Sequence, residues 1–579
     1  MKRWIKYIKP YLPFFILGPL CMMVEVVGEV LMPKFLSQII NHGVNDGNWQ
    51  YITVTCMLMI LTAVLMMVGG IGGAYFGAKA SVNFATDVRR DVYTKIQSFS
   101  FANIDKFSTG SLVTRLTNDI TQMQNFVNMV LRMFFRAPGM LIGALIMAIM
   151  LRPSLAVVLA VAIPILIIVL CIVIRVGFPR FGIMQEKVDG LNSNIQENIT
   201  NVRVVKSFVR RDFEIKKFRK SNGDLKKAGL RAMLVMICMQ PIMTLLMNIT
   251  TISVLWLGGR LVMNGAMLDG DLVAFITYIT QILMSLVMVT MMFMASSRAM
   301  ASAKRVSEVL DENIDITDEK AAQKELCVTG GKVEFKNVSF RYYKTSDRKV
   351  LNNIDLTISP GETVGIIGST GCGKTTLVSL IPRLYDADEG QVLIDGVDVR
   401  DYSLYNLREG VGMVLQKNVL FSGTIEDNLR WGDENADEEQ LRAACESAQA
   451  HMFIESFTDG YQTEIDQGGT NVSGGQKQRL CIARALLKKP KILILDDSTS
   501  AVDTATEANI RRAFKNELAE STKIIIAQRI SSVIDADKIV VMDDGVITGI
   551  GTHSELIENN KEYREIYYSQ NDKEEGGAK

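Results

Sequence analysis

The segment 368–375, Gly-Ser-Thr-Gly-Cys-Gly-Lys-Thr, combines the residue types that can hold a triphosphate. Its glycines let successive backbone N–H groups surround phosphate oxygens, Lys374 can reach the β and γ phosphates, and Thr375 can ligate Mg²⁺. An apolar run at 363–367 predicts a strand before the loop and the pattern at 375–384 predicts a helix after it, a context that a chance glycine-rich turn lacks. We therefore predict a phosphate-binding loop made of Gly368, Ser369, Thr370, Gly371, Cys372, Gly373, Lys374, Thr375 and Thr376.

Two further motifs follow this loop in the chain. Residues 491–496, Lys-Ile-Leu-Ile-Leu-Asp, have the pattern of a buried strand that ends in an acid, so Asp496 is expected to hold Mg²⁺ together with Thr375. Ser473, Gly474, Gly475 and Gln476 begin a helical pattern 23 residues before Asp496. A Ser followed by two Gly at a helix start offers backbone N–H groups to a phosphate, although the same four residues alone would be an ordinary turn.

Six apolar stretches in the first half of the chain are long enough to cross a membrane, which takes about 20 residues. They are residues 12–32, 52–76, 126–150, 154–176, 232–258 and 272–295. The two long connections, 77–125 and 176–229, continue in a helical pattern and carry 6 and 12 Lys and Arg, whereas 41–50 carries none. Because basic connections stay on the cytoplasmic side, both termini and both long connections are expected in the cytoplasm, with residues 1–10 as an amphipathic helix on the inner surface.

The composition supports a membrane protein with two different halves. Hydrophobic residues make up 48% of the 579 residues, which excludes a disordered or collagen-like chain. Residues 1–300 hold 30 Lys and Arg against 15 Asp and Glu, whereas 301–579 hold 33 against 47. The eight cysteines are scattered without metal-ligand spacing, so neither a zinc site nor a disulfide framework is expected. Nothing in the charge pattern calls for a nucleic acid partner, and the expected contacts are with the lipid bilayer and a small ligand.

Some polar and soft residues inside the predicted spans are candidates for contact with a substrate. Glu25 and Glu29 lie four residues apart on one helical face, where they could meet a cationic ligand, pair with Arg132 or Arg136, or lie in a water-filled funnel of no selectivity. Methionines of the last span could form an adaptable pocket because the Met side chain is flexible and polarizable, although ordinary helix packing explains them as well. These methionines are Met284, Met288, Met291 and Met292.

Taken together, these motifs resemble those of the ATP-binding cassette exporters, and the resemblance covers nearly the whole chain. It implies ATP and Mg²⁺ as cofactors and a dimer in which each ATP lies between one chain's phosphate loop and the other chain's Ser473–Gln476 segment, the signature. It also assigns Tyr342 to adenine stacking, Gln416 to Mg²⁺ and to a relay toward the membrane domain, and Asp503, in 500–503, to the dimer interface. The long connections resemble coupling loops, with contacts expected at 108–115 and 202–208.

Two positions depart from the family pattern. Where the family usually has a Glu that acts as general base, this chain has Asp497, and where it usually has a switch His, this chain has Gln528. Asp is one methylene shorter, and Gln cannot carry a positive charge. The combination resembles the degenerate-site half of heterodimeric bacterial multidrug exporters and implies slow hydrolysis at this chain's own site; normal hydrolysis with Asp497 shifted inward is the alternative.

The expected architecture is an α-helical transmembrane domain of six spans fused to an α/β nucleotide-binding domain. We expect the membrane domain at 1–300, a linker at 301–330, the cassette at 331–570 and a polar tail at 571–579. The expected function is ATP-driven export of hydrophobic or amphipathic compounds, multidrug-type or lipid-like, across the plasma membrane, with a second half-transporter as partner. The alternatives are a homodimeric lipid or peptide exporter and an ATP-gated channel or regulator.

Overall fold

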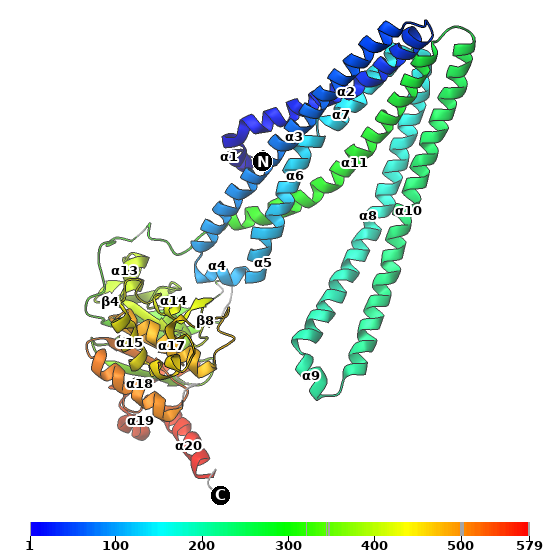
Figure 1. Ribbon diagram of the computed structural model, residues 1–579. Coiled ribbons are helices and arrows are strands. Elements are labelled where there is room, and N and C mark those ends of the chain that lie inside the picture. Colours follow the sequence, from blue (N-terminus) through cyan, green and yellow to red (C-terminus); the bar gives the residue numbers. More distant parts are fainter. Residues whose placement is uncertain (1, 320, 343, 345–347, 498–502, 577–579) are drawn as a thin grey trace. The chain divides into compact units, whose positions relative to one another are not determined.

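The computed structural model describes residues 2–319, 321–342, 344, 348–497 and 503–576 (Figure 1). The chain forms two compact units. The first comprises Met1–Gln97 and Thr109–Asp311, and the second comprises Ser98–Ser108 and Glu312–Lys579.

The first unit is helical. Six of its helical segments are long and apolar enough to cross a membrane, in agreement with the six predicted spans. Its elements are α1 (Lys2–Ile8), η1 (Lys9–Tyr11), α2 (Leu12–Gln38), η2 (Ile39–Val44), α3 (Trp49–Gln97), α5 (Thr109–Thr114), η3 (Arg115–Asp119), α6 (Ile120–Met133), α7 (Arg136–Leu151), α8 (Pro153–Thr200), α9 (Val202–Ser207), α10 (Arg211–Met263) and α11 (Asp269–Asp311).

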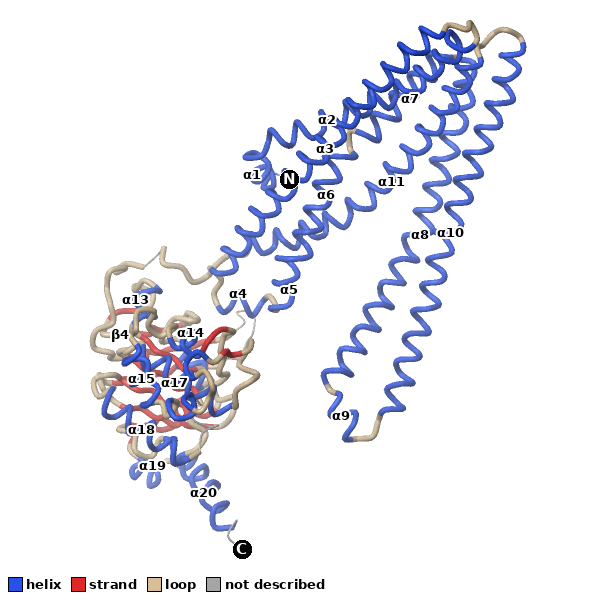
Figure 2. Tube along the Cα trace, viewed as in Figure 1, coloured by secondary structure: helices blue, strands red, loops and turns tan. Residues whose placement is uncertain are grey.

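Several of these helices are much longer than a bilayer is thick. α8 has 48 residues and α10 has 53. At 1.5 Å per residue they measure roughly 70 to 80 Å, against ~30 Å of hydrocarbon. They lie side by side and are joined by the short α9 (Figure 2). The helical patterns in the two basic connections therefore belong to helices that extend well beyond the apolar segments.

The first unit differs from the predicted elements at two places. The third predicted span, 126–150, is interrupted, since α6 ends at Met133 and α7 begins at Arg136. The predicted linker at 301–330 is helical over its first eleven residues, because α11 continues to Asp311. Charged residues are tolerated in this last part because a helix that has left the apolar region can expose them to water, so a rise in charge does not mark the helix end.

The second unit contains three sheets. Four strands, in the order β2-β1-β4-β5, form an antiparallel sheet, six strands, in the order β12-β11-β3-β10-β9-β6, form the central sheet, and β7 pairs with β8. In the central sheet β11, β3, β10, β9 and β6 are parallel, and β12 is antiparallel at one edge. The strands are β1 (Val333–Phe340), β2 (Leu351–Ile358), β3 (Thr363–Gly368), β4 (Glu389–Ile394), β5 (Val397–Asp398), β6 (Val411–Val414), β7 (Gly423–Thr424), β8 (Glu464–Ile465), β9 (Ile492–Asp496), β10 (Thr522–Ile526), β11 (Lys538–Asp543) and β12 (Val546–Gly551).

Because β3, β10 and β9 are parallel neighbours, their carboxyl ends lie at one edge of the sheet, where ligands bind in open parallel sheets, and helices complete the unit. They are α4 (Phe101–Lys106), α12 (Lys374–Ser379), α13 (Leu404–Glu409), α14 (Ile425–Leu429), α15 (Glu438–Ser447), α16 (His451–Glu455), η4 (Gly460–Gln462), α17 (Gly474–Leu487), α18 (Thr504–Glu517), η5 (Ile530–Ser532), α19 (His553–Asn559) and α20 (Lys561–Gly576). The predicted helix 375–384 is shorter than expected, since α12 ends at Ser379.

The first long connection contributes α4 to the second unit. The contact expected at 108–115 lies a few residues earlier in the chain, because Ser98–Ser108 belongs to the second unit whereas residues 109–115 belong to the first. Ser100 caps α4 and receives a hydrogen bond from the backbone N–H of Asn103, with the Asn103 side chain accepting one in return. This capping box separates α4 from the end of α3 at Gln97 and sets its boundaries.

Candidate functional site

The glycine-rich loop joins β3 to α12 with a backbone that requires glycine. Gly371 and Gly373 have φ angles of 86° and 100°, in the left-handed region that disfavours other residues. A Cβ atom on Gly368 would lie 2.0 Å from the carbonyl oxygen of Met542, so this position also has no room for a side chain. The spacing of the glycines therefore determines the loop geometry, and the phosphate-binding residues predicted at 368–376 lie together at the end of β3.

The side chain of Lys374 is hydrogen-bonded to the backbone of the loop that precedes it. Its Nζ atom donates hydrogen bonds to the carbonyl oxygens of Gly368 and Ser369, both at 2.8 Å. Lys374 also lines a pocket of about 300 Å³ beside the loop. The pocket is also lined by Tyr342, Val350, Thr370, Gly371, Gly373, Thr375, Thr376, Gln416, Asp496, Asp497, Ile526 and Gln528.

Thr375 and Asp496 form a pair that fits a hard divalent cation. The Thr375 hydroxyl donates to Oδ1 of Asp496 at 3.0 Å, and Asp496 is only 1% exposed. Its Oδ2 atom is buried and has no hydrogen-bond partner among the residues that the structure describes. Burial raises the pKa of Asp496, and the neighbouring carboxylate of Asp497 raises it further. A buried carboxylate oxygen beside a hydroxyl is a donor set that Mg²⁺ prefers, so these residues could hold the metal of a Mg·ATP complex.

Asp497 and Gln528 meet at the ends of β9 and β10. Gln528 donates a hydrogen bond from Nε2 to Oδ2 of Asp497 at 2.8 Å. Asp497 has a φ angle of 47°, an uncommon conformation for a residue other than glycine. Burial raises the pKa of Asp497, while hydrogen bonds from Gln416 and Gln528 lower it. The predicted base position, the predicted switch position and Gln416 are thus brought together in one pocket.

Tyr342 lies at the same pocket with its ring 42% exposed. Its hydroxyl lies 2.9 Å from the hydroxyl of Thr376, which joins the ring to the phosphate loop. Val350 and Ile526 also line the pocket, although neither is among the site residues predicted from the sequence. Ile526 could have been found because it ends the strand beside β3 and β9, whereas Val350 belongs to no motif.

The signature segment lies elsewhere in the second unit. Ser473 caps α17, accepting a hydrogen bond from the backbone N–H of Gln476 at 3.2 Å, and the side chain of Gln476 accepts one from Ser473. The described lining of the nucleotide pocket does not include the signature residues Ser473, Gly474, Gly475 and Gln476. It does not include Asp503 either. Asp503 caps α18 by accepting a hydrogen bond from Thr506, and residues 500–502 lie outside the described part of the chain.

Within the first unit, Glu25 and Glu29 both contact Arg136. The Arg136 guanidinium lies 3.1 Å from Glu25 and 3.3 Å from Glu29, and all three side chains are between 17% and 28% exposed. The ion pair between these glutamates and Arg136, one of the alternatives that the sequence leaves open, is therefore present. Met284 is 48% exposed, Met288 and Met292 are half-buried, and the side chain of Met291 lies outside the described residues.

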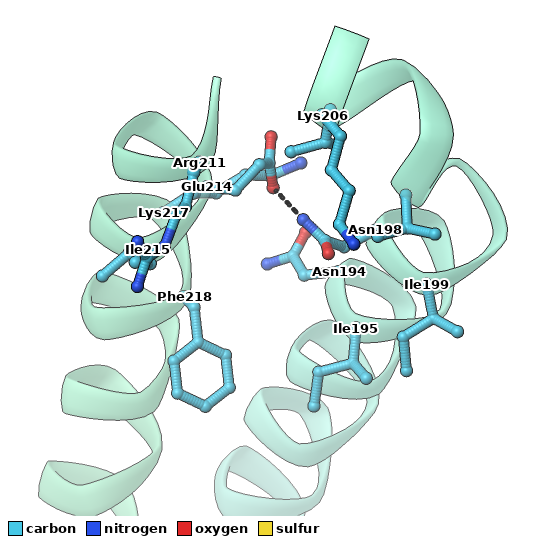
Figure 3. A pocket seen from close by; sticks show the side chains of 12 residues that line it. Asn194, Ile195, Asn198, Ile199, Lys206, Arg211, Glu214, Ile215, Lys217 and Phe218 are labelled. Atoms are coloured by element: carbon cyan, nitrogen blue, oxygen red, sulfur yellow. Dashed lines mark hydrogen bonds between the residues drawn. The ribbon is translucent and has the colours of Figure 1, made fainter. Parts of the chain in front are cut away.

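A second pocket of about 410 Å³ lies where α8, α9 and α10 meet (Figure 3). Ile195 and Ile199 of α8 and Phe218 of α10 line it, and Asn198 donates a hydrogen bond to Glu214 at 3.0 Å across the two helices. Next to it, the side chains of Phe208 and Val209 are 73% and 86% exposed. The tip of this hairpin, part of the coupling segment predicted at 202–208, is therefore apolar and open on the isolated chain.

Comparison with known proteins gives consistent results for both units. The family profile of the ABC transporter transmembrane region matches residues 15–286, and that of the ABC transporter matches residues 351–500. An uncharacterized ABC transporter ATP-binding protein of Bacillus subtilis (strain 168), YfiB, is 38% identical over 570 residues, covering 98% of each chain. The ATP-dependent lipid A-core flippase of Syntrophus aciditrophicus (strain SB) is 32% identical over 576 residues, covering 98% of this chain and 94% of the flippase.

A solved structure points the same way. The structure of a bacterial Atm1-family ABC exporter with ATP bound matches this chain with a TM-score of 0.78 and 25% identity, covering 96% of this chain and 98% of the other. Six membrane-spanning helices, a phosphate loop with an acid at the end of β9, and full-length relatives agree with one another. The chain is a multi-pass membrane protein that belongs to the ABC exporters in which a transmembrane domain and an ATP-binding domain, implying ATP-coupled transport, are fused in one polypeptide.

Proposed function

We propose that this chain is one half of a dimeric exporter that uses ATP to move hydrophobic or amphipathic compounds, multidrug-type or lipid-like, across the plasma membrane. One observation carries the proposal: the pocket beside the phosphate loop includes none of the signature residues among those described as lining it, although the same unit presents an intact signature at the start of α17. A pocket without signature residues in its described lining and a signature without a phosphate loop beside it are proposed to be completed by a second chain. The exposed Phe208 and Val209 at the hairpin tip support the same arrangement, because apolar side chains of this size are normally covered.

The residues of the pocket divide the work on Mg·ATP. Tyr342 stacks on the adenine, the loop 368–376 and Lys374 hold the phosphates, and Thr375, Gln416 and Asp496 hold Mg²⁺. The metal neutralises charge on the transferred phosphoryl group when it is bound. The partner's signature closes over the γ-phosphate, while this chain's Ser473–Gln476 and Asp503 do the same work at the partner's site.

The partner is proposed to be a different half-transporter. In this chain the carboxylate at the base position is one methylene shorter than Glu and already accepts a hydrogen bond from Gln528 at 2.8 Å. A general base must come within about 2.6 to 3.2 Å of the proton that it removes, and an amide at the switch position supplies no positive charge. Hydrolysis at this chain's own site is therefore slow, and a competent site is completed by this chain's signature on the partner.

The substrate is proposed to be a cationic amphipathic compound. Among the residues that the structure describes, the carboxylates of Glu25 and Glu29 share one cationic partner, Arg136, which leaves a surplus carboxylate within a membrane span. Such a charge is costly in hydrocarbon and is stabilised by a cation. Met284, Met288, Met291 and Met292 are proposed to supply adaptable apolar contacts. The basic connections support a topology in which both termini and the ATP-binding domain are cytoplasmic.

The decisive experiment compares ATP hydrolysis by the purified chain alone and with the half-transporter encoded beside it. We expect poor turnover alone and fast turnover in the pair. A homogeneous homodimer with robust turnover would contradict the heterodimer. Uptake of a fluorescent cationic amphipath into inverted vesicles, with ATP and with a non-hydrolysable analogue, then distinguishes a pump from an ATP-gated channel, because a channel cannot accumulate the compound.

A further inference from the structure

The helix α4 is held along its length by residues that directly follow α11. The side chain of Asn103 donates a hydrogen bond to the carbonyl oxygen of Asn313 at 2.9 Å, and the Lys106 ammonium lies 2.8 Å from Glu312. The Ser100 hydroxyl donates to Asp315. All of these residues belong to the second unit, so α4 is part of the compact body that contains the nucleotide pocket.

A tyrosine of that body contacts α4 from the other side. Tyr385 donates a hydrogen bond from its hydroxyl to Oδ2 of Asp105 at 2.9 Å, and its ring centroid lies 6.1 Å from that of Phe101. Burial raises the pKa of Tyr385, and the Asp105 carboxylate raises it further. The hydroxyl therefore remains protonated near neutral pH and acts as a donor to a charged acceptor, which is a stronger bond than one between neutral groups.

The same tyrosine ring packs against the residue that faces the adenine position. The ring of Tyr385 lies 5.2 Å from that of Tyr342 at an interplanar angle of 88°, and 5.6 Å from that of Phe340. Tyr342 is in turn joined to Thr376 through the two hydroxyl groups at 2.9 Å. A continuous path of contacts thus runs from the phosphate loop through Tyr342 and Tyr385 to Asp105.

In this path the orientation of the Tyr342 ring depends on the orientation of the Tyr385 ring. Tyr385 is not among the described residues that line the nucleotide pocket, so its influence on the nucleotide passes through a neighbouring ring, and of Tyr342 and Phe340 it is Tyr342 that lines the pocket. Edge-to-face rings hold each other's orientation, because a rotation of one ring removes the favourable contact of its edge with the other's face. If Tyr342 rotates to stack on a base, the T-shaped contact with Tyr385 requires the Tyr385 ring to reorient as well. A reorientation of this ring moves its hydroxyl group, which donates the hydrogen bond to Asp105 on α4.

We propose that Tyr385 is a positioning residue that couples the adenine site at Tyr342 to α4 of the same chain, a route separate from Gln416. This inference rests on the proposed function, since it assumes that Tyr342 stacks on adenine and that the chain transports a substrate. It assigns a role to a residue outside the sequence motifs. It also predicts that the loss of a single hydroxyl group separates ATP hydrolysis from transport.

The test is Tyr385→Phe in the reconstituted pair, which keeps the ring and removes only the donor to Asp105. ATP affinity, measured by competition against a fluorescent nucleotide, and the basal ATPase rate should stay within about twofold of the wild type. Stimulation of the ATPase by a cationic amphipath and vesicle uptake per ATP hydrolysed should fall by about tenfold, the size expected for a charge-assisted hydrogen bond. Asp105→Asn should reproduce the loss, and the double variant should add nothing to it.

Tyr402→Phe is the matched control, because it also removes a tyrosine hydroxyl of the second unit, one that donates to the carbonyl oxygen of Ile394 at 3.0 Å rather than to α4. It should leave uptake per ATP unchanged. Normal uptake and stimulation in Tyr385→Phe would overturn the inference while the proposed function stands. Parallel loss of ATP affinity and basal ATPase would overturn it too, because it would show a structural role. If the wild-type pair itself neither responds to the compound nor transports it, the proposed function fails and the inference fails with it.

Discussion

The contrast between Asp497→Asn and Ser473→Ala separates the two nucleotide sites to which this chain contributes. Asp497 lies in the chain's own pocket and accepts a hydrogen bond from Gln528 at 2.8 Å. Asp is shorter than Glu by one carbon–carbon bond of about 1.5 Å. Since a misplacement of about 1 Å can lower a rate on the order of a hundredfold, the proposed function predicts that this site supplies on the order of one percent of the pair's turnover. Asp497→Asn should therefore change the steady-state ATPase rate by less than about twofold.

Ser473→Ala should be far more damaging. Ser473 begins α17 and would place its hydroxyl and the following N–H groups against the γ-phosphate that the partner holds. Removing one preorganised donor at a working site costs about 10² to 10³ in rate. The two substitutions should therefore differ by roughly two orders of magnitude, although both affect a nucleotide site of the same protein.

A loss of helix capping must be separated from a loss of catalysis. Ser473 also caps α17, and removal of a cap costs about 1 kcal/mol of stability. Thr552→Ala removes the same kind of capping box at α19, where Thr552 is paired with Glu555, and it should leave the ATPase rate nearly unchanged. Steady-state ATPase and the thermal midpoint are measured for the three variants in the reconstituted pair. If Asp497→Asn is as damaging as Ser473→Ala, the chain's own site is catalytic and the reasoning about Asp497 and Gln528 is wrong.

Two further predictions test the metal site and the membrane cluster. Because burial holds the pKa of Asp496 above that of the unfolded chain, its ionised form destabilises the folded state at pH 7. Asp496→Asn should therefore raise the thermal midpoint of nucleotide-free protein while abolishing stabilisation by Mg·ATP. The gain should disappear as the pH falls below about 3, where Asp496 is protonated in both the folded and the unfolded state. A lower midpoint for the variant at pH 7 would contradict this argument. Glu29→Gln keeps the ion pair between Arg136 and Glu25 and removes the surplus charge, so uptake of a cationic compound should fall about tenfold more than uptake of a neutral analogue, whereas an equal fall for both would indicate a structural role.

The nucleotide motifs could be placed from sequence because their geometry is local. Gly371 and Gly373 are needed where the backbone is left-handed, and a strand before the loop fixes where the loop lies. Asp496 could be placed because a parallel strand that ends in an acid brings that acid to the same edge of the sheet as β3. Val350 could not be found, since it reaches the pocket through tertiary packing and belongs to no motif.

The membrane cluster shows the opposite case. Residues four apart share a helix face only if the helix is continuous. The sequence predicts one continuous span over 126–150, which makes Arg132 and Arg136 equivalent partners for the two glutamates. One helix ends at Met133 and the next begins at Arg136, and among the described residues the ion pairs of Glu25 and Glu29 are both made with Arg136. The contact of the first connection was misplaced for a similar reason, because the capping box at Ser100 and Asn103 creates a separate short helix that neither hydropathy nor charge reveals.

In the proposed two-chain arrangement, a substitution in this chain cannot be interpreted from this chain alone. Asp497 and Gln528 belong to the chain's own pocket, whereas Ser473 caps a helix whose first residues do not line that pocket as the structure describes it. If a second chain completes both sites, the departures at Asp497 and Gln528 slow one site, while the intact signature serves the other. Selection then acts on the two sites through different residues of one sequence. A chain can therefore lose its catalytic base and switch His and still be required for every turnover of the pair.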